Sequence, residues 1–440
     1  MRKPNWLFSW GAGGHAILDN LFAIYFLYFL LPPVESGLPE RLDNQVLFLG
    51  VTSVGLLVLL GRFSDALMDP LLAWWSDRSR SRWGRRRFFL LTAPLPFAIL
   101  ALALFLTPVA HPDPLNFWWE VVALTLFFLG YTWYLVPYLA LMPELTRGRE
   151  ERLSLATWQA VMTLVGAFLV MGAVPQLRAL TGSFVLAIGS VIAVALVLLF
   201  VPALVVREPA GRRLPSEVSF FESVRKTLAN RAFLWYLGGK ICLFTAFNIL
   251  RATVAYYPEV LLGKPASFLT WLLAAAFGSA VLWFFVVRLL AKRVSNKALM
   301  LSALVAFAVL LNGGPLILMA GSWAVPLAFV QMLLLGWPLA VLLVIPNAMV
   351  ADLAEAETLT SGERHEAQFY GTQGLFVKIA YGLAAFFVGF LFATYGKDAA
   401  HPVGVVVAGS LGAGLALLGT WSMAKFPQKA VDAVLASDSR

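Results

Sequence analysis

Residues 62–87 read RFSDALMDPLLAWWSDRSRSRWGRRR, and this stretch decides the fold. It begins as an apolar segment that carries two carboxylates, Asp65 and Asp69, and it ends as a polar run that holds six arginines. Carboxylates inside an apolar segment are costly to bury, so they indicate a function within a membrane. A dense run of arginines is typical of the cytoplasmic side of a membrane. Both parts of the stretch therefore predict a membrane protein.

The whole chain has the composition of an integral membrane protein. Of its 440 residues, 60% are hydrophobic and only 13% are charged, and the mean hydropathy is +0.80. A water-soluble fold of this length does not reach such values. The net charge of +9 lies mostly in the loops between apolar runs, so topology explains it and we expect no nucleic-acid partner. The single cysteine, Cys242, excludes an internal disulfide.

Apolar runs separated by polar segments predict twelve membrane-spanning helices. Their approximate bounds are 5–31, 46–74, 88–107, 117–142, 154–176, 183–206, 232–258, 266–290, 298–320, 323–350, 367–395 and 402–425. The loops after even-numbered spans hold twenty Lys and Arg residues, whereas the loops after odd-numbered spans hold four. By the positive-inside rule, we expect both termini in the cytoplasm.

The longest polar segment, 207–231, divides the chain into two halves of six spans, 1–206 and 232–440. The second half ends in a short polar tail. Within the linker, the sequence SFFESVRKTLAN predicts a short amphipathic helix at the membrane surface. Two six-span halves joined by a cytoplasmic linker are the plan of major-facilitator carriers, which bind solute between the halves. We therefore expect an all-α, twelve-helix major-facilitator fold.

Asp65 and Asp69 are four residues apart, so both project from one helical face, with Arg62 on the same side. One cation beside two carboxylates leaves one negative charge for a proton or a Na⁺ ion. Pro70 cannot donate a hydrogen bond to the carbonyl of Ala66, which leaves an oxygen atom near the pair as a further ligand. The alternative is a structural ion cluster that ties this helix to a neighbour.

Other ionisable residues lie inside the predicted spans. The main ones are Asp19, Lys240, Arg251 and Lys378. Lys378 lies near the middle of its span, too deep to reach the headgroups, and therefore indicates a polar cavity. Lys240 and Arg251 lie closer to the span ends, where snorkelling to the membrane surface is an equal explanation. We interpret His15 as a hydrogen-bonded residue near a helix end rather than a proton relay.

Three blocks of sequence resemble the glycoside–pentoside–hexuronide:cation symporters, the family of the melibiose permease. The first is DALMDP, from Asp65 to Pro70, with the arginine run that follows it. The second is VPYLALMPELT, at 136–146. The third comprises ADLAE at 351–355, SGERHE at 361–366 and FVK at 376–378. Because the blocks lie in both halves, the resemblance covers nearly the whole chain.

The resemblance implies that Asp65 and Asp69 bind the coupling cation, that Thr132 adds a hydroxyl oxygen, and that Lys378 approaches from the other half. Arg62 is the predicted charge partner of the cation site. The candidate residues of the solute cavity are Asp19, Tyr138, Gln159, Asn248, Arg251 and Lys378. The implied cytoplasmic gate comprises Asp77, Arg78, Arg82, Arg85, Glu144, Asp352, Glu355, Arg364 and Glu366.

The departures from the family pattern bear on the ion and the solute. Met68 stands where sodium-using members carry an asparagine, which removes an oxygen ligand and favours H⁺ over Na⁺. The usual acidic, arginine and tryptophan sugar contacts are replaced by Leu135, Gln159, Leu139 and Leu343. Arg251 stands where sugar-binding members are uncharged, and with Lys378 it would suit a sugar acid or a lysophospholipid headgroup.

The predicted function is symport of a sugar, glycoside or sugar acid with H⁺ or Na⁺ by alternating access. The alternatives are transport of a lysophospholipid or another amphiphile or anion, a channel, and a non-transporting sensor on a carrier fold. Motifs for nucleotide binding, zinc proteolysis or a nucleophilic serine are missing from the sequence, so we do not expect an enzyme.

We expect no cofactor besides the coupling ion, for which Na⁺ at Asp65 and Asp69 is one candidate. The expected partners are a small-molecule solute and the lipid bilayer. We expect a monomer in the plasma (inner) membrane.

Overall fold

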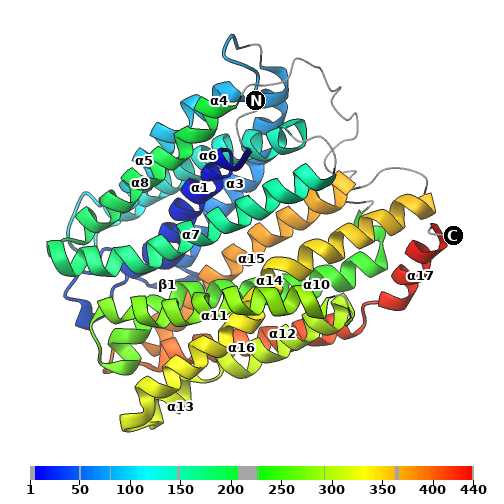
Figure 1. Cartoon of the computed structure of the whole chain (residues 1–440). Coiled ribbons are helices and arrows are strands. Elements are labelled where there is room, and N and C mark those ends of the chain that lie inside the picture. The colour runs from blue at the N-terminus through cyan, green and yellow to red at the C-terminus, as the bar shows by residue number, and fades with distance from the viewer. Residues whose placement is uncertain are drawn as a thin grey trace. The chain divides into compact units, whose positions relative to one another are not determined.

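The computed structural model of the chain describes residues 5–48, 51–79, 81–145, 149–206, 225, 227–291, 293–361 and 366–438. Most of these residues lie in long helices (Figure 1). The strands within the described residues are β1 (Val46–Phe48) and β2 (Val51–Thr52), which pair in antiparallel orientation. The all-α class predicted from the sequence is therefore confirmed.

The chain divides into two compact units. The first unit comprises Met1–Ser216 and Lys264–Trp271, and the second unit comprises Glu217–Gly263 and Leu272–Arg440. The domain boundaries predicted at 206 and 232 stay predictions, because residues 207–224 lie outside the described part of the chain. The same holds for most of the amphipathic linker helix.

The first unit contains the elements that carry the predicted cation site. Its elements are η1 (Asn5–Leu7), α1 (Trp10–Asn20), η2 (Leu21–Phe26), α2 (Leu27–Leu30), η3 (Val34–Ser36), the two strands, α3 (Ser53–Arg78), α4 (Arg87–Thr92), α5 (Pro94–Ala103), α6 (Pro114–Leu145), α7 (Arg149–Thr181), α8 (Phe184–Val205) and η6 (Ala266–Phe268). Of the short segments, η2 is π-helical and the other three are 3₁₀ turns.

The elements of the second unit are α10 (Arg231–Thr253), η4 (Val254–Tyr256), η5 (Tyr257–Leu261), α11 (Leu269–Leu290, apart from its first three residues), α12 (Asn296–Leu311), α13 (Gly314–Met319), η7 (Gly321–Trp323), α14 (Ala324–Ser361), α15 (Glu366–Tyr395), α16 (Val403–Ala424) and α17 (Gln428–Asp438). Glycines allow α10 to pack closely on α16, because a Cβ at Gly238 would lie 2.5 Å from the Ser422 hydroxyl. That hydroxyl donates instead to the carbonyl of Trp235 at 2.9 Å.

Side-chain caps determine where the long helices begin. The Thr52 hydroxyl accepts a hydrogen bond from the backbone N–H of Gly55 and starts α3. The Asp113 carboxylate accepts from the N–H of Leu115 at 2.8 Å, and Pro114 then occupies the first helical position of α6. Such caps satisfy N–H groups that have no partner within the helix. They fix the starting points of the two helices that form the site.

Within the described residues, ten helical segments are long and apolar enough to cross a membrane. The remaining two predicted spans also coincide with helix. However, α3 holds Arg62, Asp65 and Asp69 within its length, and the span at 88–107 is divided into α4 and α5. The count of twelve crossing helices therefore stays a prediction.

One local prediction was wrong. Val46–Phe48 and Val51–Thr52 form the paired strands β1 and β2 instead of the first turns of a span, because hydropathy alone does not separate a short apolar strand from a helix. The polar tail contains the helix α17, which packs on α14 and buries Val431. Amphipathic sequence at the end of a chain folds when a neighbouring helix covers its apolar side.

Gly61 sets the distance between α3 and α6. A Cβ at this position would lie 2.7 Å from Leu124 Cδ2 and 2.9 Å from Phe128 Cε2. Contacts this short force neighbouring atoms to move, so only glycine fits without repacking. The first half of the α3–α6 contact therefore depends on the absence of a side chain at one residue.

Replacement of Gly61 by alanine is expected to destabilise the protein by about 1–3 kcal/mol, because the methyl group overpacks the α3–α6 contact. The matched control is Gly189→Ala on α8, where a Cβ would make one ordinary contact of 3.9 Å with Leu102. This control is expected to be neutral or stabilising by up to about 1 kcal/mol. Thermal unfolding in detergent measures both, and equal unfolding temperatures for the two variants would contradict the packing argument.

Candidate functional site

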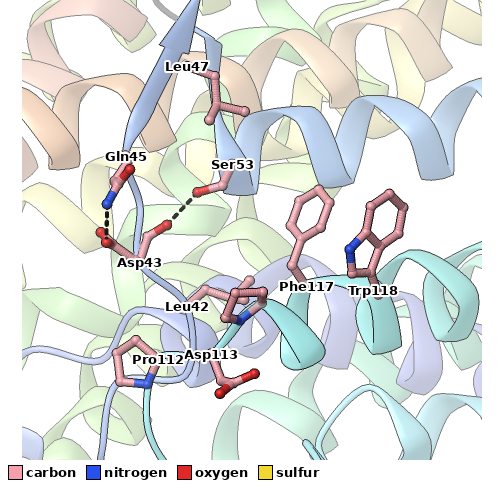
Figure 2. A pocket seen from close by; sticks show the side chains of 10 residues that line it. Leu42, Asp43, Gln45, Leu47, Ser53, Pro112, Asp113, Phe117 and Trp118 are labelled. Atoms are coloured by element: carbon pink, nitrogen blue, oxygen red, sulfur yellow. Dashed lines mark hydrogen bonds between the residues drawn. The ribbon is translucent and has the colours of Figure 1, made fainter.

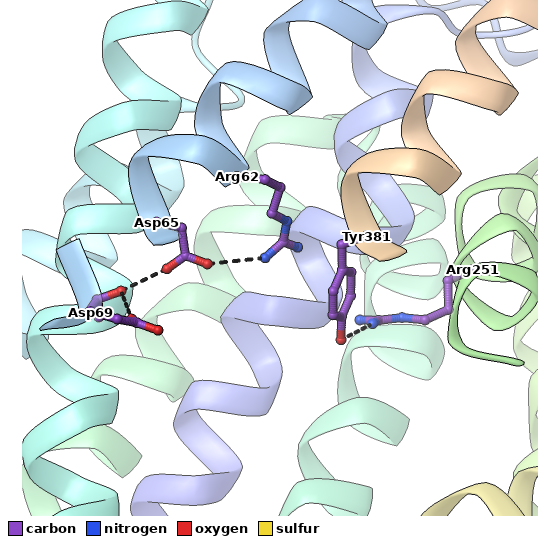
Figure 3. Close-up of polar contacts among 6 residues, drawn as sticks. Arg62, Asp65, Asp69, Arg251 and Tyr381 are labelled. Atoms are coloured by element: carbon purple, nitrogen blue, oxygen red, sulfur yellow. Dashed lines mark hydrogen bonds and ion pairs between the residues drawn. The ribbon is translucent and has the colours of Figure 1, made fainter. Parts of the chain in front are cut away.

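The helices α3 and α6 bring the predicted cation ligands together. The Thr132 hydroxyl lies 2.8 Å from Asp65 Oδ1 and 3.2 Å from Asp69 Oδ1. Figure 3 shows Asp65 and Asp69 on one side of α3, with Arg62 on the other side of Asp65. Asp65 is fully buried, whereas Asp69 is half-buried.

The geometry at Thr132 has a chemical consequence. A hydroxyl group has one proton, so Thr132 donates to one carboxylate at a time. The other oxygen–oxygen contact is favourable when a proton or a metal cation lies between the two groups. In the described part of the chain, no three His, Cys, Asp or Glu side chains are grouped to hold a metal ion. The two carboxylates and the one hydroxyl therefore leave one oxygen–oxygen contact that a proton or a cation would satisfy.

Arg62 balances the charge of Asp65. Its Nη1 lies 3.7 Å from Asp65 Oδ2, and the arginine side chain is only 5% exposed. The guanidinium also lies over two rings, 4.5 Å from the centroid of Phe128 and 5.3 Å from that of Phe22. Aromatic faces stabilise a cation that is removed from water. The role of Arg62 as charge partner was predicted, but its two aromatic neighbours were not.

Phe22 belongs to η2, the π-helical part of the first predicted span. An inserted π turn rotates the side chains that follow it, and such turns are frequent at functional sites. Near this turn, Asp19 lies half-buried on α1. We infer that the π-helical segment η2 is a local departure from α-helical geometry that is associated with the polar site.

His15 lies closer to the cation site than the sequence suggested. Its ring packs edge-on against Tyr131, the neighbour of Thr132, with 4.4 Å between the centroids. It lies within electrostatic reach of Asp19 and Asp65. His15 is in the middle of α1, and its buried Nε2 has no hydrogen-bond partner within the described residues. The interpretation as a hydrogen-bonded residue near a helix end was therefore wrong for this nitrogen.

A second polar cluster lies in the second unit, between α10 and α15. Arg251 Nη1 lies 3.3 Å from the Asn248 side-chain oxygen and 3.4 Å from the Tyr381 hydroxyl. Figure 3 shows the guanidinium directed at Tyr381. Lys378 precedes Tyr381 by one helical turn on α15 and is half-buried. The sequence indicated Asn248, Arg251 and Lys378, whereas Tyr381 was missed because a tyrosine in a span carries no charge signal.

Lys240 and Arg251 are both buried in the second unit, so neither snorkels to a membrane surface. Lys240 is 3% exposed, and its ammonium lies 5.3 Å from the ring centroid of Phe244 and 5.9 Å from that of Tyr236. The Tyr236 hydroxyl in turn joins α10 to α14 through the carbonyl of Pro346, at 2.7 Å. Packing around α10 therefore holds these cations in the interior.

The predicted cavity residues Tyr138 and Gln159 contact one another in the first unit. The Tyr138 hydroxyl donates to the carbonyl of Phe8 at 2.9 Å and accepts from Gln159 Nε2 at 3.1 Å. The Tyr138 ring is buried and stacked on the ring of Phe8. This pair therefore ties α6 and α7 to the start of the chain.

The gate residues are only partly described. Side chains lie outside the described part for Asp77, Arg78, Glu144, Arg364 and Glu366, and Arg364 is outside it altogether. Arg82 stacks on the ring of Trp83 at 5.3 Å, and Arg85 follows in the same loop. On α14, Asp352 accepts from Asn296 at 3.0 Å, while Glu355 is exposed. A gate between the two units stays a prediction.

The end of the arginine run has a structural role that the sequence did not indicate. Arg86 donates to the carbonyl of Ala140 on α6. Arg87 donates through Nε to the carbonyl of Ala203 on α8, at 2.7 Å. These two residues therefore attach the beginning of α4 to its neighbours within the first unit.

A pocket of about 390 Å³ lies beside the β1–β2 hairpin (Figure 2). Its lining residues are Leu42, Asp43, Gln45, Leu47, Ser53, Pro112, Asp113, Pro114, Phe117 and Trp118. Gln45 donates to the Asp43 carboxylate, and Ser53 donates to the Asp43 carbonyl. The pocket therefore presents polar groups at the ends of α3 and α6 where both helices begin.

Removal of Arg62 alone is expected to cost on the order of 3–5 kcal/mol, because Asp65 then remains buried without its counter-ion. The double variant Arg62→Leu/Asp65→Asn is expected to be more stable than Arg62→Leu. The expected coupling energy, the difference between the loss in the double variant and the sum of the losses in the single variants, is about 1–3 kcal/mol. Thermal unfolding of the two single variants and the double variant measures this coupling. Strictly additive losses would show that the two side chains do not interact.

Known proteins resemble the chain over most of its length. A symporter of Synechocystis, sll1374, is 25% identical over 479 aligned residues, which cover 87% of this chain and 84% of the relative. A protein of Salmonella typhimurium named as an exporter of 2,3-dihydroxypropane-1-sulfonate is 25% identical over 415 residues, covering 90% of this chain and 84% of the relative.

Among solved structures, the nucleoside transporter NupG superposes with a TM-score of 0.63 at 12% identity, covering 96% of this chain and 98% of NupG. At this identity the likeness concerns the fold alone, and it confirms the major-facilitator architecture. The sequence profile of the family described as "MFS/sugar transport protein" matches residues 7–403. The predicted resemblance to the melibiose-type symporters is thereby confirmed, and the chain belongs to the MFS/sugar transport protein family, as an integral membrane transporter and not an enzyme.

Proposed function

We propose that this transporter is a cation-coupled symporter of a small organic solute, with the cation held by Asp65, Asp69 and Thr132. The observation that carries the proposal is the single Thr132 hydroxyl within hydrogen-bond distance of both carboxylates. A site of this kind gains or loses one positive charge at low cost. A purely structural cluster has no need of a second carboxylate, since Arg62 already balances Asp65.

The cation acts by changing the charge of the first unit. Without it, Asp69 leaves an excess negative charge inside an apolar bundle, which disfavours any conformation that shields the site from water. With it, the pair together with Arg62 is neutral, and the site tolerates a closed state. Solute and cation then favour the same conformations, so each raises the affinity for the other by the same factor.

Both H⁺ and Na⁺ are candidates for the coupling ion, and we favour H⁺. The side chain at position 68 is a methionine, which offers no oxygen ligand between the two aspartates. Na⁺ prefers a fuller shell of oxygen atoms, whereas a proton needs only one carboxylate and one acceptor. The sequence predicted the carbonyl of Ala66 as an extra ligand for the cation. This carbonyl belongs to α3, which stays helical through Pro70.

For the solute, the family description supports a sugar or glycoside, and one cluster in the second unit favours a sugar acid or a related anion. Arg251, Asn248 and Tyr381 together offer a charged donor, an amide and a hydroxyl. This set matches a solute that carries an anionic group beside hydroxyl groups. The relative named for a dihydroxypropane sulfonate supports the same chemistry. A lysophospholipid remains the alternative anion.

We further propose a monomer in the plasma (inner) membrane. The charge asymmetry of the loops supports the placement of both termini in the cytoplasm. A sensor that binds solute without moving it, and a channel that moves it without accumulation, are the competing classes. Accumulation against a gradient separates the symporter from both.

Replacement of Asp69 by asparagine is expected to abolish accumulation driven by a proton or sodium gradient in proteoliposomes, because the site then no longer changes charge. The probes are glucuronate, 2,3-dihydroxypropane-1-sulfonate and a neutral methyl galactoside.

Replacement of Thr132 by valine is expected to lower accumulation about tenfold, the effect of one lost hydrogen bond, whereas Thr132→Ser is expected to retain accumulation. Ser64→Ala, which removes an exposed hydroxyl of α3 that donates to Leu60, is the control. Undiminished accumulation by Asp69→Asn would rule out this cation site.

Replacement of Arg251 by glutamine is expected to weaken binding of glucuronate or the sulfonate by on the order of 10–100-fold, the effect of a lost charge-assisted hydrogen bond. Binding of the neutral galactoside is expected to be unchanged. The control is Arg288→Gln, which removes an exposed arginine from the last turn of α11. Ligand-dependent shifts of the unfolding temperature measure binding of the three ligands to the wild type and to both variants. Stabilisation by the galactoside alone, or by lysophospholipid alone, would contradict the proposed solute.

A further inference from the structure

Glu120 is a buried carboxyl group that the proposed cation site does not use. It lies on α6 and is 0% exposed. Neither of its side-chain oxygens has a hydrogen-bond partner within the described residues. No charged side chain of that part of the chain interacts with it either. Its single charge inside the predicted span at 117–142 was a signal in the sequence, and the sequence analysis did not use it.

The register of α3 against α6 locates Glu120. Gly61 meets Leu124 and Phe128, and Asp65 and Asp69 meet Thr132, so the two helices run in the same direction and the contacting residues are 63 to 67 positions apart in sequence. Glu120 lies one helical turn before Leu124, whose side chain meets Gly61, so Glu120 and Leu124 lie on the same side of α6. Glu120 is thus about 18 Å before Thr132 along the helix axis.

The same register places Glu120 at the level of residues 53–57 on α3. Leu57 is fully buried, and so are Val54 and Val58 on either side of it. Glu120 therefore belongs to the first half of the α3–α6 contact, where α3 contributes apolar side chains. The distance from Thr132 excludes direct proton transfer between Glu120 and the cation site.

The charged groups on the elements around Glu120 have partners elsewhere. On α3, Arg62 contacts Asp65 and lies at the level of Phe128. The helix α5 has no ionisable residue, and on α4 Arg87 donates to the carbonyl of Ala203. His15 packs against Tyr131 and Phe22 packs against Phe127 and Phe128, so Asp19 lies between these levels, about two turns of α6 from Glu120. On α7, Arg178 donates to the Tyr28 hydroxyl.

On the side toward the beginning of α6, the next polar residue is Asn116, one turn before Glu120. Its side-chain amide donates to the carbonyls of Arg41, Val109 and His111. The Arg41 guanidinium lies 3.4 Å from the carbonyl of Val109, and Asp113 caps the helix. These hydrogen bonds hold the segment before α6 against the beginning of that helix. Glu120 lies one turn further along α6.

An ionised carboxylate without a partner in such a place costs far more free energy than a neutral carboxylic acid. We propose that Glu120 is a proton-binding site, separate from the Asp65–Asp69 pair, which carries its proton while the first half of the α3–α6 contact is closed and releases it when water enters that contact. The pocket beside the hairpin includes Phe117 and Trp118, the turn of α6 directly before Glu120. Proton exchange with solvent takes place from that side.

The experiment is infrared spectroscopy of the purified protein in lipid at about pH 7.5, where an exposed glutamate is ionised. The wild type shows the C=O stretching band of a protonated carboxylic acid that is lost in Glu120→Gln and in Glu120→Leu. Asp69→Asn retains this band, so the result does not depend on the proposed cation site. A band of equal intensity in the wild type and in both Glu120 variants overturns the proposal.

The stability of Glu120→Leu is the second readout. The folded wild type keeps a proton that the unfolded chain releases, so its stability falls as the pH rises, whereas the variant has no such group. The unfolding temperature of Glu120→Leu therefore exceeds that of the wild type by an amount that grows between about pH 5 and pH 8. A difference that does not change with pH shows that Glu120 is ionised in the folded protein and contradicts the proposal; if Glu120→Leu does not fold, Glu120→Gln takes its place in this comparison.

Discussion

A charge inside an apolar helix bundle is stable only where it is balanced, and the middle of α3 is built around this constraint. Arg62 lies between the carboxylate of Asp65 and the rings of Phe22 and Phe128, so its charge is covered from several sides. The two aspartates then share the hydroxyl of one threonine on α6. Because a hydroxyl has one proton, the pair remains one positive charge short of a fully satisfied arrangement. That shortage is the physical basis for assigning a cation to this place.

Packing and charge balance in the first unit depend on the same helix contact. Gly61 lies one turn before Asp65, and its missing side chain lets α6 approach α3. The same approach brings the Thr132 hydroxyl to the carboxylates, and it leaves Glu120 among apolar residues at the other end of the contact. A change that separated the two helices would therefore alter the cation site and hydrate Glu120 together. In the second unit the constraint is met differently, since the cations Arg251 and Lys240 lie against aromatic rings and neutral dipoles.

Several features of the site could be predicted because they depend on neighbours in sequence. The spacing alone places Asp65, Asp69 and Arg62 on one helical face. A carboxylate inside an apolar segment is also conspicuous in the sequence. Residues without such a signal were missed: Tyr381 beside Arg251, and Phe22 and Phe128 around Arg62. Glu120 did carry a signal but was passed over near the end of its span. The sequence predicted helix where β1 and β2 pair, since hydropathy does not distinguish a short apolar strand from a helical turn.

The sequence by itself determined the membrane class, the position of the helices and the face of α3 that carries the charges. Those properties follow from hydropathy and helical periodicity, which act over a few residues. Only the tertiary structure showed which group lies against each buried charge, although the family resemblance had implied Thr132 beside the aspartates. Thr132 is separated from Asp65 by 67 residues, and Tyr381 from Arg251 by 130. Such pairs form where two helices can approach closely, as they do at Gly61. A contact between residues so far apart produces no repeating pattern in the sequence.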